Sequence, residues 1–300
     1  MSLTYNTVPW GISSVESPRS VDSGIDNGVY NGFNMYEIAR EVAVVPMLIA
    51  NAYLAGNASS WVLVDSGIPG SQRPIRRAAA QRFGAGARPK AIVLTHGHFD
   101  HAGSAAVLAD EWGVPVYVHP LEFPFLTGRS HYPPLDGTPP GFFCGLSRLF
   151  PNSTVNLGHR LVKLDLARLP TGLEAWECHY TPGHTMGHVA FFRREDAVLL
   201  AGDAVTTMNL DSFVGTILKR RELCRPPVPA TMDWARARRS VELLAALRAR
   251  VVAAGHGAPM QNAADELQRL ADRFPLPVRG RYVRDPVRAD ETGVTYVPPG

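Results

Sequence analysis

The sequence is poor in cysteine and has no long apolar run. Cys144, Cys178 and Cys224 are the three cysteines among 300 residues. An odd number at wide spacing forms neither a disulfide framework nor a zinc knot, so we expect a reducing, cytoplasmic environment. No segment has the length and apolarity of a membrane-spanning helix. Residues 1–10 lack the basic start and apolar run of a secretion signal, although a native leader could precede this sequence.

The net charge is also small, at +3, and the basic residues are scattered. The sequence has no basic tract interleaved with aromatic residues, the pattern with which proteins grip single-stranded nucleic acid. We therefore expect a small-molecule substrate as the partner, and neither nucleic acid nor a membrane. The sequence leaves open whether the chain forms a homodimer.

Apolar strand candidates alternate with helix candidates along most of the chain, which predicts an α/β fold. Residues 1–40 are polar and predict an irregular N-terminal arm, 41–275 a catalytic domain, and 276–300 an extended, Pro- and Arg-rich C-terminal tail. The hydrophobic pattern predicts strands and helices at two sets of positions. The strands fall within 42–55 (broken by a proline), 61–65, 91–94, 114–118, 160–165, 173–180, 189–193, 197–200 and 251–254, and the helices within 73–83, 101–112, 233–249 and 263–274.

Residues 120–160 interrupt this alternation with many prolines and aromatic residues. A connection of this length is either functional or disordered, and its aromatic content argues against disorder. We interpret it as a folded insert near the functional site, with Tyr132, Phe142 and Phe143 as candidate walls of a substrate pocket. Alternatively, these rings form a small core of the insert itself.

Histidine and aspartate side chains gather after one predicted strand. Residues 95–101 read Thr-His-Gly-His-Phe-Asp-His, directly after the strand at 91–94. They supply His96, His98, Asp100 and His101. Three further candidates, each beside a glycine, follow later strands and turns: His184, Asp203 and His256. Imidazole and carboxylate groups that meet at one sheet edge suit zinc, iron or manganese.

Each of these residues also has an ordinary structural interpretation. Asp100 could cap the helix that follows it, and Asp203 could be a turn residue. His184 and His256 could be turn histidines that hydrogen-bond within the protein and bind no metal. The joint pattern favours a metal site, because four metal-binding groups fall within six residues and three more follow.

The pattern resembles the metallo-β-lactamase superfamily, whose signature is His-x-His-x-Asp-His followed by a His, an Asp and a His. The resemblance covers roughly 42–274 and is specific. It implies an α/β (α+β) fold, a four-layer αββα sandwich with the site at one edge between the two sheets. It also implies a role for each residue. His96, His98 and His184 hold one metal, Asp100, His101 and His256 hold a second, Asp203 bridges both, and Asp65 with His188 lies behind the ligands.

The resemblance further implies a dinuclear, metal-dependent hydrolase. Two divalent ions, zinc in the first place with iron or manganese as alternatives, share a hydroxide that attacks a carbonyl. Asp100 would be the catalytic residue that orients the hydroxide and carries a proton. We expect a small ester, lactone or thioester, because the stretches 102–109 and 204–214 contain no Lys or Arg. The alternatives are β-lactam or phosphodiester hydrolysis, a mononuclear iron persulfide dioxygenase, and a non-catalytic metal-binding protein.

Among family members, the sequence is most similar to lactonase-like and glyoxalase II-like hydrolases, with two departures. Lactonases place a Tyr shortly after the bridging Asp, whereas residues 204–209 here read Ala-Val-Thr-Thr-Met-Asn. A lactonase would then need Thr206, Thr207, Tyr132 or another group to stabilise the oxyanion. The Pro-rich tail is also too short for the helical C-terminal domain of glyoxalase II.

Overall fold

The computed structural model describes residues 34–147, 155–212 and 221–299. Contacts divide the chain into residues 1–31 and 32–300, and every described residue belongs to the second unit. Most of the expected arm, residues 1–33, therefore lies outside the described residues, as do 148–154 of the insert. The proposed domain boundaries stay predictions.

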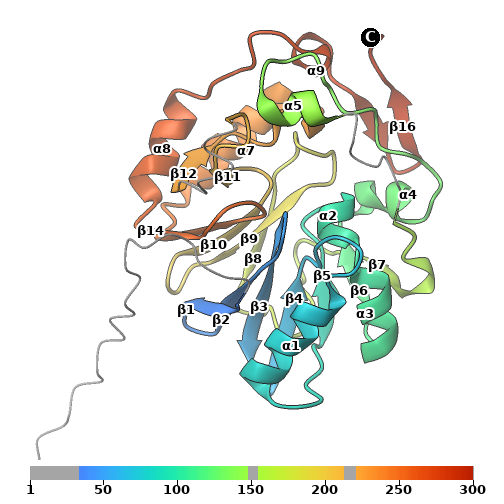
Figure 1. Ribbon diagram of the computed structural model, residues 1–300, viewed down its shortest axis with the longest axis vertical. Coiled ribbons are helices and arrows are strands. Elements are labelled where there is room, and N and C mark those ends of the chain that lie inside the picture. The colour runs from blue at the N-terminus through green and yellow to red at the C-terminus, as the bar shows by residue number, and fades with distance from the viewer. Residues whose placement is uncertain (1–33, 148–154, 213–220, 300) are drawn as a thin grey trace, which may run out of the picture. The chain divides into compact units, whose positions relative to one another are not determined.

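The first sheet contains seven strands in sequence order. The strands β1 to β4 form an antiparallel meander, and β4 to β7 run parallel to one another. Helices α1 (Gln72–Phe83) and α3 (Ala105–Trp112) contact its outer face (Figure 1). The strands are β1 (Tyr36–Ala39), β2 (Val42–Pro46), β3 (Asn51–Asn57), β4 (Ser60–Val64), β5 (Ala91–Val93), β6 (Val116–Val118) and β7 (Leu161–Lys163).

The second sheet contains five strands in the order β14-β13-β10-β9-β8. One pair, β10 with β13, is parallel and the others are antiparallel. Helices α7 (Trp234–Ala246) and α8 (Ala264–Asp272) pack on its outer face (Figure 1). The strands are β8 (Glu177–Tyr180), β9 (Val189–Arg193), β10 (Val198–Gly202), β13 (Val251–Ala254) and β14 (Met260–Gln261).

Three separate apolar cores lie between the layers. Alternate residues of a strand point to opposite faces, so Val42 and Val44 of β2 pack between the sheets, while Ala43 and Val45 face α1 and α3. A third core joins the second sheet to α7 and α8. Helix, sheet, sheet and helix thus form four layers, which confirms the αββα sandwich expected from the sequence.

The predicted strands and helices are present, with shifts at their ends. The expected helix over 101–112 is interrupted and forms α2 (Phe99–Ala102) and α3. The chain leaves the helical hydrogen-bond pattern at the break, because the Gly103 amide donates to the Gly67 carbonyl (2.9 Å) and the Ser104 hydroxyl to Ile68 (2.7 Å). The strand expected within 173–180 begins only at Glu177.

The C-terminal tail differs from the extended chain we expected. It contains the helical turn α9 (Arg281–Arg284) and a hairpin of β15 (Arg288–Asp290) and β16 (Gly293–Tyr296). Contacts with the insert explain this order. The Arg281 amide donates to Asp136 (2.5 Å), and the Val294 amide donates to the Ser130 hydroxyl (3.1 Å). The tail is thereby fastened to residues that we expected near the substrate.

The remaining elements are short. The longest described helix, α7, has 13 residues, and none of the described helices is long and apolar enough to cross a membrane.

A second hairpin pairs β11 (Thr206–Met208) with β12 (Arg221–Cys224). The short helices are α4 (Phe123–Leu126) and α5 (Phe142–Leu146), with 3-10 turns η1 (Pro120–Glu122), η3 (Gly158–Arg160) and η4 (Val228–Ala230).

Substitution of Phe191 tests the core between the two sheets. Phe191 lies in β9 and is completely buried. We expect Phe191→Ala to lower the free energy of unfolding by about 3–5 kcal/mol, because truncation removes buried surface and leaves a cavity. Urea unfolding measures this loss. Val278→Ala is the matched control, since Val278 is 93% exposed and its truncation should change stability by less than about 0.5 kcal/mol. Equal losses in the two variants would contradict the assigned core.

Candidate metal centre

The seven candidate ligands come from both sheets and meet at one edge of the sandwich. Four of them follow β5 of the first sheet. They lie in the loop that contains Thr95 and in the short helix α2 directly after it. The other three follow strands of the second sheet, with His184 after β8, Asp203 after β10 and His256 after β13. Short side chains reach a common point because both sheets end there.

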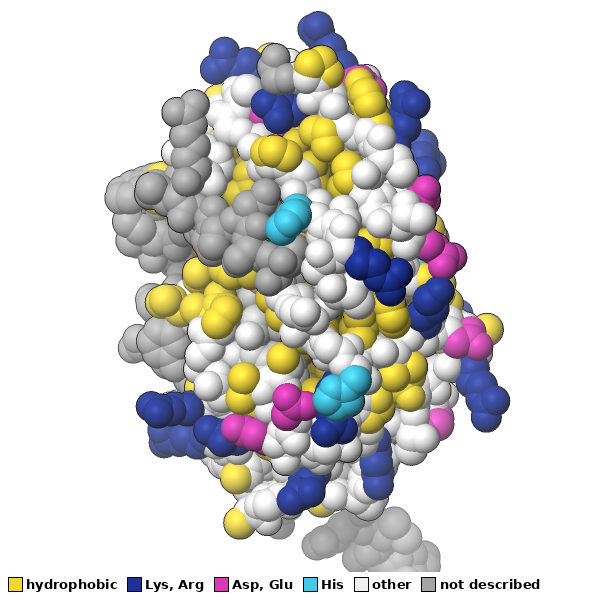
Figure 2. Space-filling model, turned by 90° about the vertical axis from the view of Figure 1, so that its right-hand side faces the viewer, with side chains coloured by type: hydrophobic (Ala, Val, Ile, Leu, Met, Phe, Trp, Pro, Cys, Tyr) yellow, Lys and Arg dark blue, Asp and Glu magenta, His cyan; other side chains and the backbone are white. Residues whose placement is uncertain are grey.

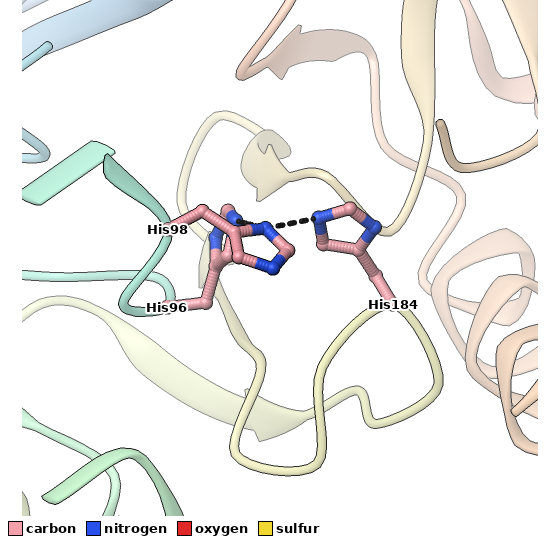
Figure 3. A group of neighbouring side chains, drawn as sticks. All are labelled: His96, His98 and His184. Atoms are coloured by element: carbon pink, nitrogen blue, oxygen red, sulfur yellow. Dashed lines mark hydrogen bonds between the residues drawn. The ribbon is translucent and has the colours of Figure 1, made fainter. Parts of the chain in front are cut away.

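His96, His98 and His184 form the first cluster (Figure 3). Nδ1 of His98 lies 3.0 Å from Nε2 of His96 and 3.0 Å from Nε2 of His184. Figure 3 shows the three rings turned toward one another from two separate loops. Three imidazole nitrogens that converge in this way form one face of a metal coordination sphere and leave further positions open.

Asp100, His101 and His256 form the second cluster, and Asp203 lies between the two. One Asp203 oxygen, Oδ2, is 3.1 Å from Nε2 of His256 and 3.4 Å from Nε2 of His184. The other, Oδ1, is 3.4 Å from Nε2 of His101. A single carboxylate thus reaches ligands of both clusters, as a bridging residue must.

Two buried atoms at the centre support this assignment of a metal site. Nε2 of His101 and Oδ1 of Asp203 are buried and make no hydrogen bond within the described part of the chain. Buried polar groups are rarely left unpaired, because their desolvation is not compensated. Both atoms are metal-ligand types and both face the interior of the clusters. The donor set therefore fits divalent cations.

Hydrogen bonds on the far side of the rings orient the ligands. His101 Nδ1 lies 2.8 Å from Asp65 Oδ2, and His256 Nδ1 lies 2.9 Å from the Ile49 carbonyl. The Thr95 hydroxyl donates to Asp65 (2.8 Å), so it accepts from His96 Nδ1 (3.1 Å). Each contact places the ring proton on Nδ1 and leaves an Nε2 lone pair for a metal. Asp65 thus lies behind the ligands, where we expected it.

His188 acts on the backbone of Asp203. Its Nδ1 contacts the Thr181 hydroxyl (2.8 Å), and its Nε2 accepts the Asp203 amide proton (2.9 Å). Burial lowers the pKa of His188 to about 3, so its Nε2 keeps the lone pair that this bond needs. His188 therefore positions Asp203, and its ring lies beside those of His96 and His184, with centroids 5.1 and 6.0 Å away.

The two clusters differ in charge. Burial lowers the pKa of His96 and His184 well below its ordinary value and lowers the pKa of His98 to about 4. Burial acts in the same direction on His101 and His256, but the Asp203 carboxylate and other acids outweigh it and raise their pKa. The histidines of the first cluster thus keep their lone pairs free, whereas the acids of the second cluster favour the protonated, positively charged forms of His101 and His256, whose charge a metal cation would replace.

A pocket that is partly open to solvent lies over the candidate ligands. Tyr132 and Phe143 line it as expected from the sequence, but Phe142, its neighbour, is not among the lining residues. Apart from the candidate ligands, the described lining is apolar or aromatic. It consists of Ile49, Phe99, Tyr132, Pro133, Leu135, Phe143, Pro227, Pro229 and Ala230.

The hydroxyl groups considered for oxyanion stabilisation are engaged elsewhere. Thr206 donates to the Met208 carbonyl (2.9 Å) and Thr207 to the His256 carbonyl (3.0 Å). Tyr132 donates to Glu122. We therefore assign none of the three to the oxyanion.

Sequence reasoning missed Glu122, a fully buried carboxylate beside the site. It lies in the insert and accepts hydrogen bonds from residues next to His98 and His184. The only local signal is a charged residue between Leu121 and Phe123 in an apolar segment. Nothing in that segment indicates which groups the carboxylate meets.

Comparison with known proteins agrees with this geometry. A model of the metallo-β-lactamase superfamily matches residues 45–256. The chain belongs to this superfamily. It is 38% identical over 245 residues to the probable metallo-hydrolase YflN of Bacillus subtilis, covering 80% of this chain and 93% of that protein. It is also 31% identical over 179 residues to the probable metallo-hydrolase YybB of B. subtilis, covering 59% and 72%.

Solved structures share the fold of this superfamily member. The metallo-β-lactamase family protein TTHA1429 of Thermus thermophilus superposes with a TM-score of 0.56 at 25% identity, covering 79% of this chain and 80% of that one. TTHA1623, solved in a di-iron-bound form, gives a TM-score of 0.51 at 27% identity, covering 74% and 94%. The chain is a metal-dependent hydrolase of the metallo-β-lactamase superfamily.

Asp65 offers a test of the hydrogen bonds behind the ligands. Asp65→Asn should weaken metal binding roughly 10- to 100-fold, because an amide orients the His101 ring less strongly than a carboxylate does. Competition with a chelator measures the affinity. Asp110→Asn is the control, since Asp110 is 63% exposed and pairs with Arg160 at the surface. Wild-type affinity in Asp65→Asn would show that Asp65 does not tune the site.

Proposed function

We propose that this metallo-hydrolase is dinuclear and cleaves a small carboxylic ester, lactone or thioester with an apolar acyl group. One observation carries the proposal. Seven ligands in two adjoining clusters lie beneath a pocket whose other described walls are apolar or aromatic. The clusters support two cations, and the walls support the acyl group.

His96, His98 and His184 would hold one cation, and Asp100, His101 and His256 the other, with Asp203 shared. Two bound divalent cations would lower the pKa of water from 15.7 toward about 7 and polarise the carbonyl of the substrate. Zinc suits this ligand set, and so do iron and manganese. TTHA1623 was solved with two irons, so iron ranks beside zinc in the proposal.

Asp100 is the residue we assign to proton transfer. It lines the pocket, and its side chain keeps 14% of its surface exposed, more than any other carboxylate of the clusters. Its Oδ2 is 3.5 Å from Nε2 of His256. The same carboxylate can therefore orient a nucleophilic water and pass a proton to the leaving group.

The charge of the pocket supports a carbonyl substrate over a phosphodiester. Phosphate substrates are held by Lys and Arg, and the described lining contains neither. On the face shown in Figure 2, Lys and Arg side chains are spread among acidic and apolar ones instead of gathering in one patch. An apolar acyl chain, by contrast, gains stability when Leu135 and Phe143 remove it from water.

A hydrolysis panel on metal-loaded protein tests the proposal. We expect about two metal ions per chain by elemental analysis and the highest kcat/KM on a lactone, ester or thioester. The panel includes β-lactams and bis(p-nitrophenyl) phosphate, and oxygen consumption with glutathione persulfide is measured in parallel. Faster turnover of the phosphodiester or the β-lactams would overturn the substrate class. One ion per chain together with oxygen consumption would favour a persulfide dioxygenase instead.

Neighbouring phenylalanines allow a matched test of the pocket wall. Phe143→Ala should raise KM most for substrates with long acyl chains, by up to roughly 100-fold, because a lost aromatic contact is worth up to about 3 kcal/mol. Phe142→Ala makes the same chemical change one residue away, outside the described lining, and should leave KM unchanged. Metal content should stay at the wild-type level in both. If Phe143→Ala keeps the wild-type KM for every substrate of the acyl series, Phe143 does not belong to the substrate site.

A further inference from the structure

Glu122, at the end of η1, is a fully buried carboxylate with four hydrogen-bond donors. Its Oε1 accepts from the Thr185 hydroxyl and the Gly187 amide, each at 2.7 Å. Its Oε2 accepts from the Gly97 amide at 2.9 Å and from the Tyr132 hydroxyl. Both oxygens are therefore saturated by donors.

These donors favour the ionised form of the side chain. Two of the four are backbone N–H groups, which can donate but never accept. A protonated carboxyl or an amide would need one of the two hydroxyls to turn and accept its hydrogen. Burial raises the pKa of Glu122, and the four hydrogen bonds oppose that rise because they stabilise the anion. The surroundings of Glu122 thus stabilise a negative charge there.

The donors belong to three different parts of the metal centre. Gly97 separates His96 from His98 in the loop after β5. Thr185 and Gly187 follow His184 in the loop before β9, in the other sheet. Glu122 thus joins the two loops that carry all three ligands of the first cluster.

Tyr132, the fourth donor, belongs to the pocket wall. Its ring lies edge-on to His98, with centroids 4.6 Å apart, and stacks on Phe125 at 4.1 Å. The hydrogen bond to Glu122 therefore fixes an aromatic wall against a ligand of the first cluster.

Two glycines allow these close approaches. A Cβ atom on Gly187 would lie 2.6 Å from Cγ of Glu122, and one on Gly97 would collide with the Tyr132 hydroxyl. Any larger residue at either position would push the loops away from the carboxylate.

We propose that Glu122 is a positioning residue that ties both ligand loops and Tyr132 into one unit and so sets the metal affinity of the first cluster. This inference rests on the proposed function, since it assumes that His96, His98 and His184 bind a cation. The effect is selective, because ligands of the second cluster are held from elsewhere. His101 is oriented by Asp65 and His256 by the Ile49 carbonyl.

The substitution Glu122→Gln keeps the size of the side chain and removes its charge. The hydroxyls of Thr185 and Tyr132 can turn to accept from the new amide, but the N–H groups of Gly97 and Gly187 cannot. One of the two backbone N–H groups must therefore lose its bond to residue 122. We expect zinc to bind the first cluster roughly 10- to 100-fold more weakly, as is typical for residues that orient metal ligands.

The experiment measures Zn²⁺ affinity by chelator competition in two backgrounds. His256→Ala disables the second cluster, so that the remaining ion reports on the first. His184→Ala disables the first cluster and reports on the second. Glu122→Gln should weaken zinc binding in the His256→Ala background and leave it unchanged in the His184→Ala background. Glu242→Gln, the same change at a side chain 45% exposed on α7, should have no effect in either.

The outcomes separate this inference from the proposed function. If the wild-type chain binds fewer than two zinc ions, the dinuclear proposal fails first. If the wild-type chain binds two, the comparison is between His256→Ala alone and the double variant with Glu122→Gln. Equal zinc affinities in these two proteins would show that the positioning role of Glu122 is wrong. An equal loss in both backgrounds would show a general structural role and would also overturn the inference.

A milder variant keeps the test informative if Glu122→Gln does not fold. Thr185→Ala removes one donor and leaves the carboxylate and its other three bonds. It should weaken zinc binding in the His256→Ala background by less than Glu122→Gln, and again leave the second cluster unchanged. Circular dichroism of the metal-free variants shows whether each is folded. Unchanged zinc affinity in folded Thr185→Ala would contradict the proposed link between Glu122 and the His184 loop.

Discussion

The structure depends on bringing imidazole nitrogens and a carboxylate together in a largely buried space. Nε2 of His96 and of His184 both lie 3.0 Å from Nδ1 of His98, and the Asp203 carboxylate is buried beside them. Without a cation this arrangement is unfavourable, because Nε2 of His101 and Oδ1 of Asp203 are buried and make no hydrogen bond within the described part of the chain. The surrounding fold must therefore supply rigidity from both sheets. A bound cation would interact favourably with all the converging nitrogen and oxygen atoms, so the same arrangement would then stabilise the fold.

That rigidity comes from where the ligand loops begin and from what lies behind them. The loops after β5, β10 and β13 leave buried strands, and the loop with His184 leaves the half-buried strand β8. Close packing of the loops also requires small residues. A side chain at Gly255, directly before His256, would collide with the Asp203 carboxylate. The glycine that precedes a ligand is thus needed by a second ligand from another strand.

The sequence allowed the layers and the clustered ligands to be predicted, because both are local patterns. A continuous apolar run identifies a strand such as β2, and the residues from His96 to His101 lie within six positions of the sequence. Glu122 could not be found in this way. Its four partners come from three segments that are far apart in the sequence. They meet only through the tertiary packing of the two ligand loops and the insert. The contacts between Asp136 of the insert and the tail depend on the same tertiary packing.

Phe142 and Phe143 show a further limit of sequence reasoning. Successive residues of a helix point about 100° apart, so the two adjacent phenylalanines of α5 point in different directions. We expected no helix in the insert, and α5 decides that Phe143, not Phe142, faces the ligands. The metal-binding edge is formed by the αββα sandwich, while the insert supplies much of the opposite wall and is fastened by the tail. Under the proposed function, changes in the insert would alter the choice of substrate and leave the metal centre intact, except where Glu122 connects the two.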